Sequence, residues 1–362
     1  MKHRAKPNLL MEAIAYLGNR ANVYKIADME SRLKDRNVSD LTEFHEQFKV
    51  LKGLIHAMDR DIRLPQKTLE RYFKDLPGFP FNSIGGYSLG FLLLYPVEEP
   101  FYENLEKFLE YKANLSQEEV CKNLLLALDF KDEIQEGMKE YQTVFLSKVL
   151  SMEIASDTKL QILDLQARYK DHLMEVSNVL RPVLGFLMEH RAKLESMAET
   201  FLSRLDDEEN VEYVQEIMGL SDGDKDHIKI IPFVLGADTN LLVDHVNSKI
   251  NAYVYAGVLR DLLKKLMYSR ILTTDNVYDC VKLLGDRTRF DILLFLKQKD
   301  AYSSDLVEEL KLARTTIHHH MTKLIDADLV APIVDGNKVM YRLNREKMSE
   351  LLNKQREFLL GD

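Results

Sequence analysis

Apolar residues recur at helical spacing through most of the N-terminal part of this sequence. Leu9, Leu10, Ile14 and Leu17 form one such stripe, and a longer stripe runs through residues 41–62. Positions three and four apart lie on the same face of an α-helix, so each stripe predicts an amphipathic helix. The longer stripe consists of Phe44, Phe48, Leu51, Leu54, Ile55 and Met58.

Two local signals predict where helices of this part begin and end. Ser116 and Glu119 have the spacing of a capping box, in which each side chain bonds the backbone N–H of the other, and they predict a helix over 120–128. A long helical pattern covers residues 159–205 but contains Pro182. Proline ends or kinks a helix because it lacks an N–H, so two helical segments are expected there.

The periodicity changes between residues 228 and 255. Three short runs rich in Ile, Val, Leu and Tyr, at 228–235, 241–243 and 250–255, predict a small antiparallel sheet. The helical pattern returns at 257–269 and predicts a linker helix. The expected domains up to this point are therefore a helical one at 1–225, and a β segment with its linker at 226–273.

The composition supports a mainly helical protein that contains a hydrophobic core. Apolar residues make up 46% of the 362 positions and charged residues 30%, and only 15 Gly and 9 Pro occur. The two cysteines, Cys121 and Cys280, form neither a disulfide framework nor a zinc motif. No signal peptide and no apolar run long enough to span a membrane is evident, so we expect a cytoplasmic protein.

The C-terminal part, residues 274–362, has more specific signals. Residues 277–284 form a helical stripe, after which Asp286 is placed to cap a second helix. Ser303-Ser304-Asp305 opens a short third helix. A fourth helix is expected from Arg314 to Ala327, and its core positions are Ile317, Met321 and Leu324.

Two extended runs follow the fourth helix, at 329–334 and 338–343. Asp335-Gly336-Asn337 separates them, and Asp-Gly between β-branched runs is typical of a β-hairpin. This order of helices and hairpin is that of a winged helix-turn-helix, whose recognition helix fits the DNA major groove. The expected fold class is thus mainly α: a helical N-terminal region with a small β segment, then a winged helix-turn-helix domain at 274–362.

The same residues carry a family resemblance that covers about 85 positions. The C-terminal part resembles the ArsR/SmtB class of bacterial winged-helix repressors through four motifs in the family's order. Their residues are Leu284-Gly285-Asp286-Arg287-Thr288-Arg289 with Ile292-Leu293, Thr316-Ile317-His318-His319-His320-Met321 with Lys323-Leu324, Ala327-Asp328-Leu329-Val330, and Tyr341-Arg342-Leu343.

The sequence departs from the family in two ways. Ala313 stands where a serine usually caps the recognition helix, and Asp328 replaces the glycine of the turn before the wing. The family's metal sites also lack support, because residues 303–311 contain no cysteine and residues 344–362 no histidine. We therefore expect no metal and no cofactor.

The predicted DNA-binding residues lie on the recognition helix and the wing. Arginine pairs with guanine and threonine contacts phosphate or the thymine methyl group, while wing cations contact phosphate. His320 is expected to be a half-buried support of the helix, as the resemblance implies. The predicted set is Arg314, Thr315, Thr316, His318, His319, Thr322, Lys323, Lys338 and Arg342.

The resemblance further implies a homodimer, paired through helices at about 275–284 and 345–359, that binds an inverted repeat of double-stranded DNA. Residues 274–362 carry a net charge of −1 and the preceding residues −8, an asymmetry in the direction that DNA binding requires. The expected function is a transcriptional regulator, most simply a repressor and not an enzyme. Its N-terminal region would sense an unknown small-molecule or protein effector, or extend the dimer.

The sequence also offers three other interpretations. Three adjacent histidines on a helix point about 100° apart, so His318, His319 and His320 are not expected to chelate one ion. Gly86-Tyr87-Ser88-Leu89-Gly90 matches the nucleophile elbow of α/β-hydrolases, but no repeated βα pattern accompanies it. The alternatives are thus an enzyme that uses Ser88 and is fused to a DNA-binding module, or a protein-interaction scaffold.

Overall fold

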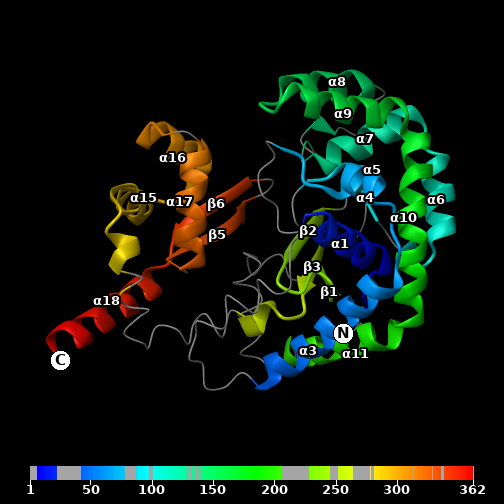
Figure 1. Ribbon diagram of the computed structural model, residues 1–362. Coiled ribbons are helices and arrows are strands. Elements are labelled where there is room, and N and C mark those ends of the chain that lie inside the picture. The colour runs from blue at the N-terminus through cyan, green and yellow to red at the C-terminus, as the bar shows by residue number, and fades with distance from the viewer. Residues whose placement is uncertain are drawn as a thin grey trace. The chain divides into compact units, whose positions relative to one another are not determined.

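The protein is mainly α-helical and ends in a winged helix-like domain (Figure 1). The computed structural model describes residues 6–22, 42–77, 87–97, 101–128, 130, 133–134, 138, 140–205, 228–244, 252–263, 278, 281–312, 314–327, 329–335 and 338–361.

These residues form two compact units. One unit contains the described residues of 6–205 and 228–261, and the other those of 262–361. The strands near residue 230 thus belong to the same unit as the N-terminal helices. The division into three domains expected from the sequence, at 1–225, 226–273 and 274–362, remains a prediction.

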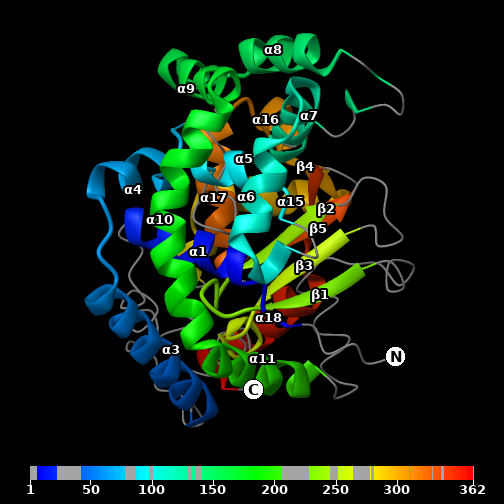
Figure 2. The ribbon, with the colours of Figure 1, turned by 90° about the vertical axis from the view of Figure 1, so that its right-hand side faces the viewer.

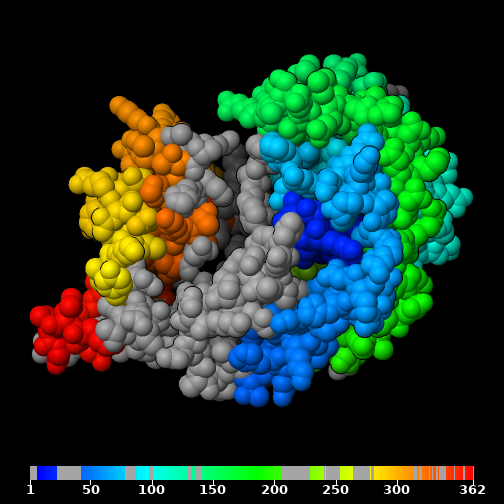
Figure 3. Space-filling model, viewed as in Figure 1, coloured from blue at the N-terminus to red at the C-terminus, as the bar shows by residue number. Residues whose placement is uncertain are grey.

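The first unit is built from α-helices of 6 to 21 residues, as the stripes of apolar residues predict, and one short 3-10 helix, η1. Its capping box is formed, because Ser116 Oγ accepts a hydrogen bond from Glu119 N and Glu119 Oε2 accepts one from Ser116 N. Figure 3 shows α10 and α6 together along the outer edge of this unit. Its helices are α1 (Leu9–Ala21), α3 (Thr42–Asp61), α4 (Gln66–Phe73), α5 (Leu89–Leu94), η1 (Phe101–Glu103), α6 (Leu105–Ala113), α7 (Gln117–Ala127), α8 (Tyr141–Ser151), α9 (Ser156–Ala167), α10 (Tyr169–Glu189) and α11 (Arg191–Leu205).

The expected break at Pro182 is wrong, because α10 continues through that residue. The proline removes the hydrogen bond to the carbonyl of Asn178, one turn earlier. Asn178 and Pro182 both lie on the exposed face of α10, where water can solvate the released carbonyl. The long pattern is instead divided before Tyr169 and after Glu189.

Helix α1 lies at the centre of the first unit and is buried over most of its length. Figure 2 shows α10 crossing α1, which it contacts. Asn8 caps α1 and also donates a 2.8 Å hydrogen bond to the Tyr255 hydroxyl, while Asn19 Nδ2 donates to the carbonyl of Leu235 at 3.1 Å. These polar contacts tie the first helix to chain segments more than 200 residues later.

The small sheet of the first unit is mixed, which corrects the expected antiparallel arrangement. Its strand order is β1 (Ile228–Phe233), β3 (Ala252–Gly257), β2 (Asn240–Asp244). The pair β2–β3 is antiparallel, but β1 pairs with β3 in parallel. Strand β3 lies between β1 and β2. Strands β1 and β3 run in the same direction, and β2 runs in the opposite direction.

The second unit contains α15 (Arg287–Gln298), β4 (Ala301–Tyr302), α16 (Ser303–Leu310), α17 (Arg314–Asp326), β5 (Val330–Asp335), β6 (Lys338–Leu343) and α18 (Arg345–Leu360). Asp286 caps α15 as predicted, accepting a 3.0 Å hydrogen bond from Arg289 N. Its expected first helix is described only in part, at residues 278 and 281–284, and the linker helix only at 260–263. Ala313 and Asp328 lie outside the described residues.

The wing of the second unit is the hairpin that the sequence predicts. Strands β5 and β6 pair antiparallel, with Val330 opposite Leu343 and Asp335 opposite Lys338. The strand order is β4–β6–β5, so the short β4 covers the outer edge of β6. The chain reverses between residues 335 and 338, where the Asp-Gly signal lies.

Candidate nucleic-acid interface

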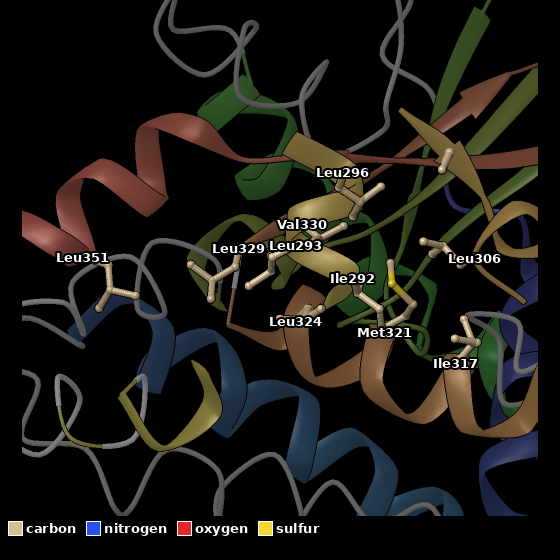
Figure 4. Close-up of a cluster of buried hydrophobic side chains, with 11 residues drawn as sticks. Ile292, Leu293, Leu296, Leu306, Ile317, Met321, Leu324, Leu329, Val330 and Leu351 are labelled. Atoms are coloured by element: carbon tan, nitrogen blue, oxygen red, sulfur yellow. The ribbon is translucent and has the colours of Figure 1, made fainter. Parts of the chain in front are cut away.

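Helix α17 is held against the core of the second unit by one apolar face. Ile317, Met321 and Leu324 are each at most 1% exposed. In Figure 4 these side chains point toward the leucine and isoleucine side chains of α15. The burial of one face fixes which way the helix is turned, so its opposite face points away from this core. The inward face was predicted correctly from the spacing of these three residues.

Those predicted DNA-binding residues of α17 whose side chains the structure describes lie outside that buried face. The backbone of Arg314 and Thr315 is in its first turn, and His318 and His319 follow one turn later; the side chains of these four lie outside the described residues. Thr322 and Lys323 have exposed side chains, and Thr316 is half-buried. The geometry therefore presents one polar helix face, while the contacts of its individual side chains remain predictions.

His320 connects α17 to the start of α15. Its side chain is 14% exposed, and its Nδ1 lies 3.6 Å from Asp286 Oδ1. Asp286 is itself held by the hydrogen bond from Arg289 N. This hydrogen bond is the largest of the causes that lower the pKa of the Asp286 carboxyl. Arg289, 8% exposed, donates to the carbonyl of Leu283 at 2.7 Å. Helix α17 thus meets the start of α15 through this polar contact as well as through its apolar face, and the spacing of residues alone did not predict the polar contact.

The wing arginine is already engaged within the protein. Arg342 Nε and Nη2 donate to Asp300 Oδ2 at 2.9 and 2.6 Å, and this bond raises the pKa of the guanidinium. The side chain is 59% exposed, so the pair lies at the surface, where such pairs contribute little to stability. The sequence did not predict Asp300 as the partner of Arg342, because the two residues are 42 positions apart. Lys338 begins β6, and its side chain lies outside the described residues.

The Gly-x-Ser-x-Gly motif has a structural role. Ser88 is 5% exposed and caps α5, where its Oγ accepts a 3.2 Å hydrogen bond from Phe91 N. A Cβ at Gly90 would lie 2.9 Å from the carbonyl oxygen of Tyr72, so the glycine lets α5 approach α4. The described residues around Ser88 form no strand before this helix, as a nucleophile elbow would require.

Replacing Ser88 by alanine tests this structural role. Ser88→Ala is expected to lower the free energy of unfolding by about 1 kcal/mol through loss of the cap. It should leave hydrolysis of a chromogenic ester at the buffer background, as in the unaltered protein. Ester hydrolysis by the wild type that disappears in the variant would instead favour the enzyme.

The described residues offer neither a metal centre nor a membrane-spanning helix. No three His, Cys, Asp or Glu side chains among them are grouped to hold a metal ion. None of the helices that the structure describes is both long and apolar enough to cross a membrane.

Comparison with known proteins finds relatives of the second unit. Residues 286–331 match the family model "Bacterial regulatory protein, arsR family". The arsenical resistance operon repressor of Staphylococcus aureus is 35% identical over 72 residues, which are 20% of this chain and 69% of the repressor. That of Staphylococcus xylosus is 39% identical over 66 residues, or 18% of this chain and 64% of the repressor.

A third relative is more distant but is covered more completely. The transcriptional repressor SdpR of Bacillus subtilis is 28% identical over 78 residues, which are 22% of this chain and 87% of that protein. No solved structure matches. The similarity lies in about a fifth of the chain, so it gives no information on the helical first unit.

Proposed function

The chain belongs to the ArsR family of bacterial regulatory proteins, and on that premise we propose that it represses transcription as a homodimer bound to an inverted-repeat operator. It is a DNA-binding regulator of transcription. The observation that carries the proposal is the orientation of α17, whose apolar face is buried and whose other side exposes Thr322 and Lys323.

In the proposed complex, α17 enters the major groove and its first two turns contact base edges. Arg314 pairs with guanine, and His318 contacts a neighbouring base. Further phosphate or base contacts come from other residues of the same helix, namely Thr315, Thr316, His319, Thr322 and Lys323. Lys338 and Arg342 of the wing bind the phosphate backbone. Arg342 exchanges Asp300 for a phosphate. Breaking the ion pair with Asp300 costs little free energy, because the pair lies at the surface.

Exposed apolar side chains support the proposed dimer. Val281 is 44% exposed in the first helix of the domain, and Leu352 and Leu359 are 51% and 76% exposed on α18. Leu352 and Leu359 are seven residues apart, which places them on one face of α18. These helices are those through which the family resemblance implies pairing. A second copy of the chain would remove this surface from water.

Negative charge introduced into this apolar surface by substitution is expected to separate the dimer into monomers. Leu352→Asp/Leu359→Asp should weaken self-association at least about a hundredfold, because two leucines no longer transfer from water into the interface. Sedimentation equilibrium measures the dissociation constant of the dimer. The matched control is Leu150→Asp/Leu160→Asp, which alters two leucines, 60% and 63% exposed, on α8 and α9. If the α18 variant sediments as a dimer and the control does not, the interface is misplaced.

We further propose that the helical region senses an effector or extends the dimer, with domain limits at 1–225, 226–273 and 274–362. The protein acts in the cytoplasm, where its DNA lies. No observation favours the enzyme that uses Ser88. The scaffold alternative differs in salt dependence, since binding to DNA weakens steeply as salt rises.

Selection from genomic DNA tests the proposal. The full-length protein is incubated with fragmented genomic DNA of its source at physiological salt, and the retained fragments are sequenced. The expected result is enrichment of a few inverted repeats whose half-sites lie about one helical turn, or a multiple, apart. Retention without sequence preference, or no retention, would contradict sequence-specific regulation.

A further inference from the structure

Four polar side chains of α4, α9 and α10 form one hydrogen-bonding network in the first unit, where α10 contacts both other helices (Figure 2). We call it the pocket network, because Asp164 and His172 line a pocket of about 390 Å³. Its members are Tyr72 of α4, Asp164 of α9, and His172 and Glu175 of α10. Asp164 Oδ2 lies 3.2 Å from His172 Nε2, and His172 Nδ1 lies 2.6 Å from the Tyr72 hydroxyl oxygen. That oxygen also lies 2.8 Å from Glu175 Oε2.

The pocket network has three contacts at hydrogen-bond distance but, with a neutral imidazole, only two hydrogens to fill them. Burial, above all, raises the pKa of the Tyr72 hydroxyl, which therefore keeps its single hydrogen. The bond from Arg168, above all, lowers the pKa of the Asp164 carboxyl, which therefore brings none. Glu175 is paired with Arg71 as a carboxylate. A neutral imidazole carries one N–H and an imidazolium two, so only the protonated ring supplies a hydrogen to every contact.

The arrangement of hydrogens with a neutral ring follows from the partners of each atom. The N–H of neutral His172 lies on Nε2, because otherwise a nitrogen lone pair would face the carboxylate of Asp164. The Tyr72 hydroxyl then donates to Nδ1, an acceptor on a side chain that is only 3% exposed. Glu175 goes without the hydroxyl at small cost. It is 46% exposed to water and keeps the bond from Arg71 Nη1 at 3.0 Å.

Protonation of the ring reverses the Tyr72 hydroxyl. Nδ1 of His172 then donates to the hydroxyl oxygen, and the hydroxyl hydrogen turns to Glu175 Oε2. A hydrogen bond between α4 and α10 is thereby exchanged for one that ends on a charged carboxylate, and such bonds are the stronger kind. Burial, above all, lowers the pKa of the His172 imidazole, although Asp164 raises it. The neutral arrangement therefore prevails at pH 7, and acid brings the protonated one.

The charges around the ring permit this protonation. They are contributed by α4 and the residues after it, by α9 with the residue that follows it, and by α10, while α5 carries no charged residue. Carboxyl groups outnumber cations among them, so a positive ring is not repelled by its surroundings as a whole. The carboxyl groups are those of Glu70, Asp75, Asp164 and Glu175, and the cations are Arg71, Lys74 and Arg168.

Protons can reach the buried ring through the same network. The two carboxylates at its ends, Asp164 and Glu175, are 39% and 46% exposed. Asp164 contacts Nε2 directly, so a proton from water passes to the ring through a group that the solvent reaches. The low exposure of His172 itself therefore does not isolate it from the pH of the solution.

We propose that the pocket network is an acid-operated switch, in which a proton taken up at His172 turns the Tyr72 hydroxyl from His172 to Glu175. The proton comes from the solvent, and no covalent bond other than the new N–H forms. The switch gives the helical first unit a response to acid at the junction of three of its helices. It concerns this unit alone, and neither the switch nor its test depends on the DNA-binding role.

Nuclear magnetic resonance of the ring nitrogens tests the hydrogen count. The full-length protein is labelled with ¹⁵N-histidine, and the signals of His172, one of ten histidines, are identified by their loss in His172→Gln. We expect the Nε2–H tautomer in neutral solution and two protonated nitrogens in acid, with a midpoint below the ordinary pKa of 6.5. The Nδ1–H tautomer in neutral solution, a ring that is already charged there, or a ring that never becomes charged while the protein is folded would overturn the proposal.

A pair of variants tests the turn of the hydroxyl. Glu175→Gln weakens the acceptor that the hydroxyl reaches only in acid, so the His172 midpoint should fall by at least about half a pH unit. The same substitution in a Tyr72→Phe background should change the midpoint less than half as much, because the hydroxyl that links the two groups is gone. Equal effects in both backgrounds would mean that Glu175 acts by its charge alone, and the switch would be refuted. Thermal unfolding checks that the variants fold, and the tautomer of the wild type is independent of them.

Discussion

The Arg314→Ala/His318→Ala variant is expected to lose about a hundredfold or more of its preference for the operator over random DNA. Each good contact to a base edge is worth about 1–3 kcal/mol of discrimination, and the variant removes two such contacts in the proposed complex. Non-specific affinity should fall much less, because the phosphate contacts of the wing remain. Fluorescence anisotropy with an enriched fragment and a scrambled one, at the same salt concentration, measures the ratio.

Two cations outside α17 provide the matched control. Arg287 is the first residue of α15 and Lys299 follows its last residue, and both side chains are exposed. Arg287→Ala/Lys299→Ala alters the same number of residues, removes positive charge and should keep the preference for the operator. A recognition-helix variant that retains the wild-type ratio of affinities would show that α17 is not the element that specifies sequence.

The second large effect is expected at Glu12, a fully buried carboxyl of the central helix α1. Its Oε1 and Oε2 accept hydrogen bonds from Val234 N at 2.8 Å and Leu235 N at 2.6 Å, at the end of β1. Glu12→Ala removes both acceptors and leaves two buried N–H groups without partners. Each unsatisfied group costs about 1–3 kcal/mol, so we expect a loss of about 2–6 kcal/mol in the free energy of unfolding.

Chemical denaturation followed by circular dichroism measures the loss. Glu46→Ala, at an exposed position of α3, is the control and should stay within about 0.5 kcal/mol of wild type. Glu12→Gln keeps one acceptor and should lie between the two. An alanine variant as stable as the control would mean that Glu12 does not hold the sheet to α1.

The stability that Glu12 contributes should also depend on pH. Burial raises the pKa of its carboxyl to about 8, although the two backbone N–H groups lower it. The folded state therefore holds a proton that the unfolded state releases above its ordinary pKa of 4.5. The resulting stability is fully present below about pH 4.5 and is lost as pH rises through about 8. The stability difference between wild type and Glu12→Gln should accordingly shrink over this range.

Sequence patterns predicted the second unit well because its signals are local. Asp286 and Arg289 are three residues apart, and the face formed by Ile317, Met321 and Leu324 spans little more than two turns. The hairpin follows from one turn motif between two β-branched runs. Each of these elements is fixed by contacts between neighbours in sequence, which a pattern records directly.

The first unit shows what local patterns miss. Exposure of Pro182 decides that α10 continues, and exposure is a property of the packed molecule. The parallel pairing of β1 and β3 depends on the path between them. The pocket network joins Tyr72 and His172, which are 100 residues apart. No spacing rule predicts such contacts, because packing of distant helices brings them together.

Methylation protection on an enriched operator tests the central claim, that α17 lies in the major groove, most directly. Dimethyl sulfate attacks guanine N7 in the major groove and adenine N3 in the minor groove. The wild-type protein is expected to protect guanine N7 in two patches about one helical turn apart, and the Arg314→Ala/His318→Ala variant to leave them reactive. Guanines that stay reactive under saturating wild-type protein, with protection only at adenine N3, would contradict the account.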